Sequence, residues 1–211
     1  MKDFDISLYL VTDSSYHTEE SLLRTVEEAC RGGATLVQLR EKEKSGAEYL
    51  ALARRVKELT DRFSIPLIID DRVDVAMAAE AAGVHLGAAD IPIREARRLM
   101  GEGKIIGATA KTVKAAKKAY EDGADYLGTG AIFPTTTKVA TVITEISVLN
   151  EICRAVPIPV AAIGGLNEEN IEALRESPID GVAVVSAIMK AEEPREATRR
   201  LLEKLQRMRR K

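Results

Sequence analysis

KAYEDGADYLG, residues Lys118–Gly128, joins the end of a helical pattern to a short apolar run through a glycine turn. Three other stretches share this order: EEACRGGATLVQL (Glu27–Leu39), AAEAAGVHLG (Ala78–Gly87) and RESPIDGVAVV (Arg175–Val185). Each stretch ends a helix, turns at Gly or Asp-Gly, and enters a strand. The repeat therefore predicts a chain in which helices and strands alternate.

Apolar runs of strand length occur eight times along the chain. They are Leu8–Val11, Leu36–Leu39, Leu67–Ile69, Val84–Leu86, Ile105–Ile106, Tyr126–Leu127, Val160–Ile163 and Val182–Val185. Helical patterns, with apolar residues three and four apart, are expected near Glu19–Arg31, Gly46–Arg62, Val73–Ala81, Ile93–Met100, Val113–Asp122, Glu145–Ala155, Glu168–Arg175 and Ala187–Met208. This alternation favours parallel βα units.

The four repeat stretches precede the second, fourth, sixth and eighth predicted strands. A unit that recurs at every second βα step fits a closed (β/α)8 TIM barrel better than an open flavodoxin-like or Rossmann sheet, whose edge strands normally differ. No glycine-rich dinucleotide motif follows an early strand, which further weakens the Rossmann alternative. We predict one α/β barrel domain over residues 1–211.

Composition restricts the partners and the cellular setting. The 31 basic and 33 acidic residues give a formal charge of -2, so no overall field attracts nucleic acid or an anionic membrane. Two cysteines without metal-ligand spacing, an acidic start that enters a strand at once, and no membrane-length apolar run lead us to expect a cytoplasmic protein. The expected partners are small molecules, and a homo-oligomer is left open.

Clustered charge and hydroxyl groups follow three of the predicted strands. VQLREK (Val37–Lys42) and LIIDDR (Leu67–Arg72) run directly into charge, and GADYLGTGAIFPTTTK (Gly123–Lys138) ends in hydroxyls and a cation. In a barrel, the loops that follow the strands share one face, where active sites are built. These segments therefore predict a site for a phosphorylated ligand, with an ordinary solvated loop as the alternative for each segment taken alone.

Gln38, Arg40 and Lys42 alternate with their neighbours, so the two-residue period of a strand places them on one side. A bidentate arginine and a point-charge lysine suit a pyrophosphate group. The alternative is a solvated strand end in which Glu41 pairs with Lys42.

Asp70 and Asp71 end the third predicted strand, and Asp90 follows the fourth. Neighbouring strands lie about 5 Å apart, so these carboxylates can converge. Hard oxygen donors without nearby Cys or His favour Mg²⁺, which often bridges carboxylates and substrate phosphates. Loop caps are the alternative.

Two further strands run into features that suit a phosphate. The seventh reaches Gly164 and Gly165, and the eighth reaches Ser186, which could cap the last helix. A tight turn and an ordinary cap are the alternatives. His85, inside the VHL strand pattern, is expected to be a hydrogen-bonded residue of the core or the barrel mouth rather than a catalytic one.

Over essentially its whole length, the chain resembles the thiamine-phosphate synthase family, also called thiamine-phosphate pyrophosphorylase. LYLVTD, VQLREK, IIDDRVDVA, GVHLGAAD, GADYLGTGAIFPTTTK, AAIGGL and VAVVSAI occur in the family's order. The resemblance implies a (β/α)8 barrel that uses Mg²⁺. Its reaction would join hydroxymethylpyrimidine pyrophosphate to thiazole phosphate, releasing pyrophosphate and thiamine phosphate.

The resemblance also implies roles for individual residues. Catalytic pyrophosphate contacts would come from Arg40, Lys42 and Lys138, and metal contacts from Asp71 and Asp90. The substrate-binding set would be Gln38, Arg40, Lys42, Asp70, Thr109, Thr135, Thr137, Lys138, Gly165, Val185 and Ser186. Within it, Gln38 would face the pyrimidine, the two threonines after the sixth strand would hold ligand, and the last three residues would bind the thiazole phosphate.

Four positions depart from the family pattern. Asp70 replaces a usual Asn, Ala88 a usual Gln, Ala131 a usual Pro, and Lys111 a position often occupied by His. These changes bear on substrate affinity and specificity more than on the class of reaction.

The sequence contains no recognisable Ser or Cys nucleophile beside a base. We therefore expect a dissociative displacement, in which metal and cations stabilise the departing pyrophosphate and the thiazole nitrogen captures the pyrimidine carbon. One alternative is a thiazole tautomerase, which needs a positioned acid or base and in similar proteins a His where Lys111 stands. The other is a binding protein without turnover, for which Asp70 and Ala88 are the best support.

Overall fold

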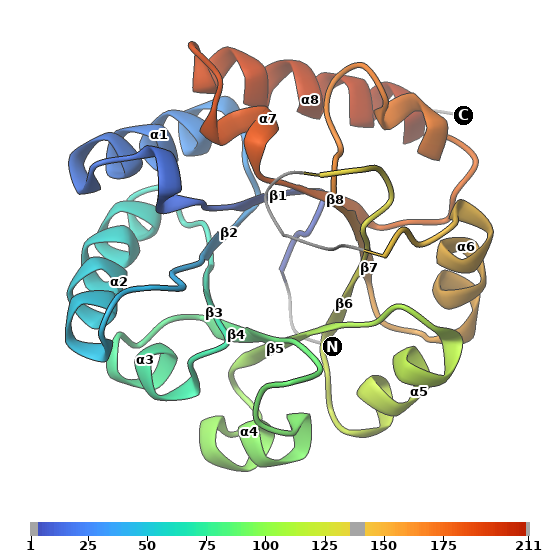
Figure 1. Ribbon diagram of the computed structural model, residues 1–211, viewed down its shortest axis with the longest axis horizontal. Coiled ribbons are helices and arrows are strands. Elements are labelled where there is room, and N and C mark those ends of the chain that lie inside the picture. The colour runs from blue at the N-terminus through green and yellow to red at the C-terminus, as the bar shows by residue number, and fades with distance from the viewer. Residues whose placement is uncertain (1–3, 136–141, 210–211) are drawn as a thin grey trace.

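Eight parallel strands form a closed barrel in the computed structural model, which describes residues 4–135 and 142–209 (Figure 1). The strands are β1 (Leu8–Val11), β2 (Leu36–Leu39), β3 (Leu67–Asp70), β4 (Gly83–Leu86), β5 (Ile105–Thr109), β6 (Tyr126–Gly130), β7 (Val160–Ile163) and β8 (Gly181–Val184). Each strand pairs with the next along the chain, and β8 pairs with β1. The predicted TIM barrel is confirmed.

The helices form a ring around the barrel (Figure 1). They are α1 (Glu19–Gly32), α2 (Gly46–Asp61), α3 (Val73–Ala78), α4 (Ile93–Met100), α5 (Val113–Glu121), α6 (Ile146–Ala155), α7 (Ser186–Met189) and α8 (Pro194–Arg209), with the 3-10 turns η1 (Ser14–Tyr16) and η2 (Ile171–Leu174). Local signals explain several helix ends. A capping box between Ser45 and Glu48 starts α2, and Gly33, in a left-handed conformation, ends α1.

The repeat stretches share a hydrogen bond that joins neighbouring strands. The side chain of the residue just before the strand accepts from a backbone N–H of the preceding strand: Thr35 from Leu8 at 3.0 Å, and Asp180 from Val160 at 2.8 Å. Asp125 does the same for β5, at 2.7 Å. The repeat therefore fastens every second strand pair at the amino-terminal end of the barrel, except at β4, where an alanine precedes the strand.

Two predicted helices differ in the structure. The pattern Glu168–Arg175 yields only the 3-10 turn η2, although the Asn167 side chain accepts from the N–H groups of Glu169 and Asn170 as an N-cap residue would. The pattern Ala187–Met208 is divided into α7 and α8. Pro194 explains this break, since proline has no N–H to donate and suits the first position of a helix.

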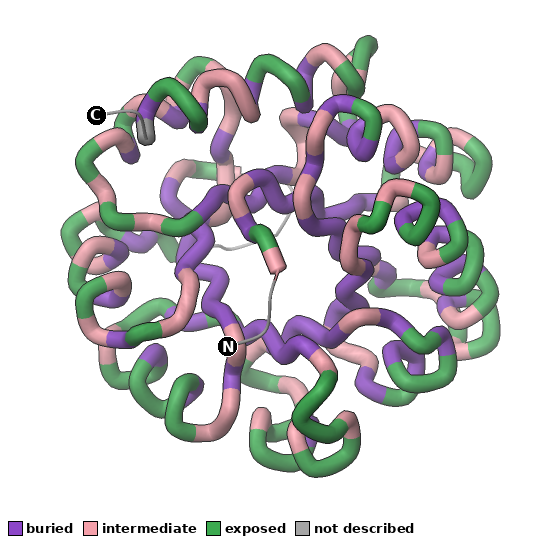
Figure 2. Tube along the Cα trace, turned by 180° about the vertical axis from the view of Figure 1, so that it is seen from behind, coloured by how far each residue is buried: buried purple, intermediate pink, exposed green. Residues whose placement is uncertain are grey.

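Apolar side chains form two cores, one between barrel and helices and one inside the barrel. The inner core is Ile6, Tyr9, Val11, Leu36, Ile68, Ile105, Tyr126, Ala161 and Ala183. These residues come from alternate positions of the strands, as the two-residue period requires. The segment before β1 lies across one end of the barrel in the rear view (Figure 2), where Phe4 packs edge-on to Tyr126 at 5.8 Å.

None of the helices in the described ranges is long and apolar enough to cross a membrane.

Candidate active site

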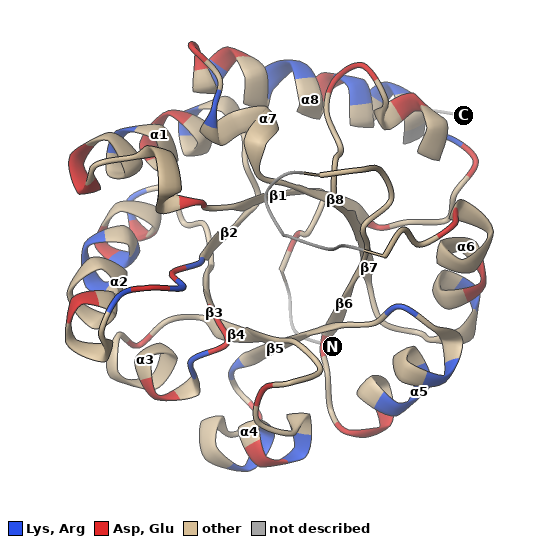
Figure 3. Ribbon diagram, viewed as in Figure 1, with Lys and Arg blue, Asp and Glu red and all other residues tan. Residues whose placement is uncertain are grey.

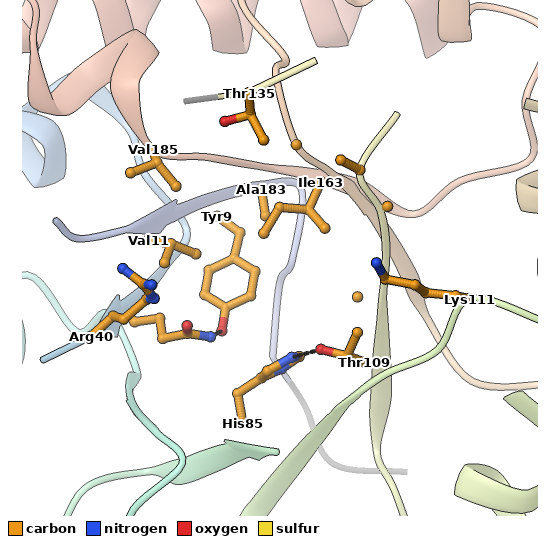
Figure 4. Close-up of a pocket in the computed structure, with 15 residues that line it drawn as sticks. Tyr9, Val11, Arg40, His85, Thr109, Lys111, Thr135, Ile163, Ala183 and Val185 are labelled. Atoms are coloured by element: carbon orange, nitrogen blue, oxygen red, sulfur yellow. Dashed lines mark hydrogen bonds between the residues drawn. The ribbon is translucent and has the colours of Figure 1, made fainter. Parts of the chain in front are cut away.

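A pocket opens at the carboxyl ends of the strands (Figure 4). It is lined by Tyr9, Val11, Gln38, Arg40, His85, Thr109, Lys111, Gly128, Gly130, Ala131, Thr135, Ile163, Gly164, Ala183 and Val185. Five residues of the predicted substrate-binding set are among them, namely Gln38, Arg40, Thr109, Thr135 and Val185. Residues predicted from separate motifs therefore lie together in one pocket.

Charged residues lie on the loops after β2 and β3 (Figure 3), and one of them, Arg40, also lines the pocket. Lys42 Nζ lies 2.8 Å from Asp70 Oδ2 and also forms an ion pair with Asp71. Arg40 Nε lies 3.7 Å from the same oxygen of Asp70. Two cations and two carboxylates predicted from separate motifs are thus in contact.

Asp71 links this cluster to the loop after β4. Its carboxyl group is hydrogen-bonded to that of Asp90, and its backbone N–H donates to the carbonyl of His85 at 2.9 Å. Its φ of 61° lies in the left-handed region, which Asp tolerates better than most residues. Asp90 is held in turn by the N–H of Gly87, which donates to its Oδ2 at 2.6 Å.

The pKa values of the three carboxyl groups move in different directions. Burial raises the pKa of Asp70, and the hydrogen bond from Lys42 offsets this only in part. Burial would also raise the pKa of Asp71, but the hydrogen bond and charge of Lys42 outweigh it, so this pKa is lowered. Burial and the contact with Asp71 raise the pKa of Asp90 despite the Gly87 hydrogen bond. The contact between the carboxyl groups of Asp71 and Asp90 therefore disfavours the state in which both are ionised.

The donor set fits Mg²⁺ bound by a pair of carboxylates. Among the described residues, no three His, Cys, Asp or Glu side chains are grouped to hold a metal ion. Mg²⁺ in phosphate-transfer sites, however, usually needs one or two carboxylates, with water and substrate oxygens completing the octahedron. Asp71 and Asp90 supply that number of hard oxygen donors, and the ammonium of Lys42 shows that the site already attracts positive charge.

The pocket floor is polar and carries hydrogen bonds from strand to strand. Gln38 Nε2 donates to Tyr9 Oη at 2.5 Å, and Tyr9 Oη lies 2.7 Å from Tyr126 Oη. His85 Nδ1 lies 3.1 Å from Tyr126 Oη, and His85 Nε2 lies 3.0 Å from Thr109 Oγ1. Figure 4 shows the His85 side chain joined to Thr109 beneath the pocket.

Glycines make room for the rings of this floor. A Cβ on Gly107 would lie 2.1 Å from Tyr126 Cζ, and one on Gly128 would lie 3.2 Å from His85 Cε1. The glycines in IIGAT and YLGTG thus leave the barrel interior to two aromatic rings.

The groups of the floor are held in their neutral forms. Burial lowers the pKa of His85 to about 4. Burial also raises the pKa of Tyr9 and of Tyr126 well above the usual value for tyrosine. At neutral pH the pocket therefore has an uncharged floor and charged groups at its rim.

The side expected to bind the thiazole phosphate differs in detail from the prediction. Ser186 is the first residue of α7 rather than its cap, because Val185 occupies the N-cap position and no side-chain cap bond forms. A Cβ on Gly165 would lie 2.5 Å from the carbonyl oxygen of Pro134. A glycine here therefore lets the loop after β6 pack closely against the backbone. Gly164 and Val185 line the pocket, and Gly165 and Ser186 follow them in sequence.

Several residues in or under the pocket were not in the predicted substrate-binding set. Tyr9, His85 and Lys111 line the pocket, and Tyr126 lies directly under it. The alternation of LYLV and YLGTG could have placed both tyrosines inside the barrel, whereas their mutual contact depends on strand register. Figure 4 shows Lys111 and Arg40 reaching the pocket from opposite sides. Thr137 and Lys138 lie outside the described residues.

The four departures from the family pattern all lie near the site. Lys111 and Ala131 line the pocket, and Asp70 binds Lys42 beside it. Ala88 lines an adjoining cavity that also includes Asp90.

Comparison with known proteins agrees with the geometry. The family model described as thiamine monophosphate synthase matches residues 8–188. "Thiamine-phosphate synthase 2" of Streptococcus pneumoniae serotype 4 is 54% identical over 200 residues, covering 95% of each chain. "Thiamine-phosphate synthase" of Clostridium tetani is 49% identical, covering 95% of this chain and 96% of that one.

Solved structures show the same relationship. Thiamine phosphate pyrophosphorylase from Pyrococcus furiosus superposes with a TM-score of 0.88 at 37% identity, covering 97% of both chains. 3-Hexulose-6-phosphate synthase shares the fold, with a TM-score of 0.72 at 17% identity over 94% of this chain and 99% of that one. The matched length, the identities and the ordered strand-end motifs establish that this chain belongs to the thiamine monophosphate synthase family.

Proposed function

We propose that this protein is a thiamine-phosphate synthase that joins hydroxymethylpyrimidine pyrophosphate to thiazole phosphate, with Mg²⁺ bound by Asp71 and Asp90. The observation that carries the proposal is the meeting of Lys42, Asp70 and Asp71 beside a pocket with an uncharged floor. The charged rim suits a metal–pyrophosphate group, and the uncharged floor suits a heterocycle.

Arg40 and Lys42 face the departing pyrophosphate in this proposal. Each cation stabilises negative charge as the bond between the pyrimidine methylene carbon and the pyrophosphate oxygen breaks and its electron pair leaves with the oxygen. Bound Mg²⁺ would supply further electrostatic stabilisation of the leaving group. The backbone N–H of Arg40 donates to Thr12 Oγ1 at 3.0 Å, which fixes the start of this loop.

The new carbon–nitrogen bond uses the lone pair of the thiazole nitrogen. No proton needs to move in this step, so the pocket needs orientation and charge rather than a general base. Gln38 would face the pyrimidine, and Thr135 would contact ligand from the loop after β6. Gly165, Val185 and Ser186 would hold the thiazole phosphate on the other side.

The state of His85 argues against a tautomerase. Both of its ring nitrogens are hydrogen-bonded, to Tyr126 and Thr109, and burial lowers its pKa to about 4. An imidazole in this state has no free nitrogen with which to carry a proton between two carbons.

The deciding experiment measures pyrophosphate release from the purified protein with both substrates and Mg²⁺, with each component omitted in turn. A synthase releases pyrophosphate only when both substrates are present and loses activity in a chelator. Isomerisation of the thiazole without pyrophosphate release would identify a tautomerase. Binding of both substrates without any turnover would identify a binding protein.

A further inference from the structure

One chain of hydrogen bonds crosses the barrel floor and involves side chains from five strands. In spatial order its members are Gln38, Tyr9, Tyr126, His85 and Thr109. The first four are buried, whereas Thr109, at the end of β5, is exposed to the pocket. The chain therefore connects a buried amide to a hydroxyl that a ligand can reach.

The amide of Gln38 sets the direction at one end. Its Nε2 group donates to Tyr9 Oη, so the tyrosine hydroxyl directs its own proton onward to Tyr126 Oη, 2.7 Å away. The Tyr126 hydroxyl has then accepted one bond and donates to His85 Nδ1 at 3.1 Å. If Tyr126 instead donated to Tyr9, the Tyr9 oxygen would accept from both Gln38 and Tyr126. The buried hydroxyl proton of Tyr9 would then have no acceptor, which is unfavourable.

The direction decides which nitrogen of His85 carries the proton. Since Nδ1 accepts from Tyr126, the neutral imidazole has its hydrogen on Nε2, which donates to Thr109 Oγ1 at 3.0 Å. The Thr109 hydroxyl has thereby accepted its bond within the protein. Its own proton remains available to a ligand in the pocket.

We propose that Tyr126 is a positioning residue, which acts through His85 to fix the Thr109 hydroxyl as a hydrogen-bond donor toward bound substrate. Tyr126 does not line the pocket and is fully buried. Its ring packs edge-on against Phe4 and Tyr9, with centroids 5.8 Å away in both pairs. The matching substrate group is a hydrogen-bond acceptor, such as a ring nitrogen of the pyrimidine that the proposed function places on this floor.

The first test measures the tautomer of His85 by nitrogen NMR at neutral pH, without any substrate. The chain has two histidines, so the His85 signals are those that disappear in His85→Gln. The wild-type protein should have a proton on Nε2 and none on Nδ1. In Tyr126→Phe, which keeps the ring and removes the hydroxyl, the tautomer with its proton on Nδ1 should become measurably populated. A proton on Nδ1 in the wild-type protein, or an unchanged tautomer in Tyr126→Phe, would overturn the proposal.

The second test is a double-mutant cycle on kcat/KM for the pyrimidine substrate, and this kinetic part alone rests on the proposed function. Tyr126→Phe and Thr109→Val should each lower kcat/KM by up to about tenfold, the upper end expected for one hydrogen bond. If Tyr126 acts through Thr109, the double variant should resemble Thr109→Val alone, whereas independent effects would multiply to about 100-fold. Multiplying effects would contradict the proposal.

Tyr120→Phe is the matched control, because Tyr120 is exposed on α5 and outside the pocket. It should change neither the His85 signals nor kcat/KM. The outcome of the NMR test does not depend on the outcome of the kinetic test. A protein without synthase activity would refute the proposed function, while the tautomer of His85 would still decide the direction of the hydrogen-bond chain.

Discussion

Lys42 and Asp70 form an ion pair in which Nζ lies 2.8 Å from Oδ2, beside the pocket where a pyrophosphate group is proposed to bind. A substrate must therefore compete with a carboxylate of the protein for this cation. Asn, the usual residue of the family at this position, would not offer that competition. The ion pair thus joins Asp70, which departs from the family pattern, to Lys42, an expected catalytic residue.

Asp70→Asn should lower the Mg²⁺ requirement and tighten binding of the pyrimidine substrate. The substitution keeps the size of the side chain, releases Lys42 and removes a like charge beside Asp71. An ion pair of this partly exposed kind is worth up to about 1 kcal/mol, so KM should fall by about two- to fivefold. Steady-state titrations of substrate and Mg²⁺ measure both effects. Loss of activity, or a sharply increased Mg²⁺ requirement, would instead make Asp70 a required ligand.

Asp71→Asn should remove most of the turnover while preserving the fold. Asn tolerates the left-handed φ of 61° at this position but supplies a weaker donor to a metal ion. We expect kcat/KM to fall by roughly 100-fold, as for loss of one preorganised electrostatic group. Asp74→Asn, a nearby exposed carboxylate paired with Arg72, is the control. Equal activity of the two variants, with calorimetry showing both folded, would refute the metal assignment.

Arg40→Ala and Ser186→Ala should affect different substrates. Arg40 lines the pocket beside the acidic cluster, so its loss should raise KM for the pyrimidine substrate and lower kcat. Ser186→Ala should mainly raise KM for the thiazole phosphate, and the resemblance leads us to expect that Lys138→Ala behaves like Arg40→Ala. Arg98→Ala, an exposed residue paired with Glu95, serves as the control. Equal losses for both substrates in all three site variants would exclude separate binding regions.

Gly107→Ala should destabilise the barrel through a clash with Tyr126. The new methyl group would lie 2.1 Å from Tyr126 Cζ, inside a packed interior. Overpacking of this kind costs about 1–3 kcal/mol of unfolding free energy, which urea denaturation measures. Gly103→Ala is the control, because a Cβ there has nothing within 4 Å. The urea midpoint of Gly107→Ala should be lower than that of Gly103→Ala. Equal midpoints would mean that the floor is not packed as described.

Cys30 should resist alkylation in the folded protein. Burial raises the pKa of its thiol to about 12, so at pH 8 only about one molecule in ten thousand has the reactive thiolate. Mass spectrometry after iodoacetamide treatment should show slow modification under native conditions and rapid modification in denaturant. Burial raises the pKa of Cys153 to about 11, so its thiol should also be modified slowly under native conditions and rapidly in denaturant. Native labelling of Cys30 within minutes would contradict this burial.

The strand pattern was predictable because it depends on local sequence. Leu8–Val11, Leu36–Leu39 and Val160–Ile163 have the predicted bounds, since each is a short apolar run between polar turns. Helix lengths were less predictable, since the apolar spacing of Glu168–Arg175 suits a helix but the structure has only the short turn η2 there. The division between α7 and α8 was signalled by Pro194, which the periodicity of the flanking apolar residues concealed.

The site was predictable where charge marks a strand end. Arg40, Lys42 and Asp71 follow the ends of β2 and β3, so the fold alone brings them to one rim. The contact between Tyr9 and Tyr126 could not be foreseen, because these residues are 117 positions apart and meet across the barrel interior. Their hydrogen bond depends on tilt and register, which the sequence pattern does not specify.

The glycines beneath the pocket lie against the same aromatic rings that carry its hydrogen bonds, so a change in the depth of the floor would also change its polar groups. Gly107 and Gly128 have no side chain to shorten, so space beside them on the floor would have to come from smaller residues in place of Tyr9 or His85. Either replacement would also interrupt the series of donors and acceptors that ends at Thr109. Deepening the floor for a bulkier heterocycle would therefore also require replacement of the lost donors and acceptors, which calls for paired rather than single substitutions.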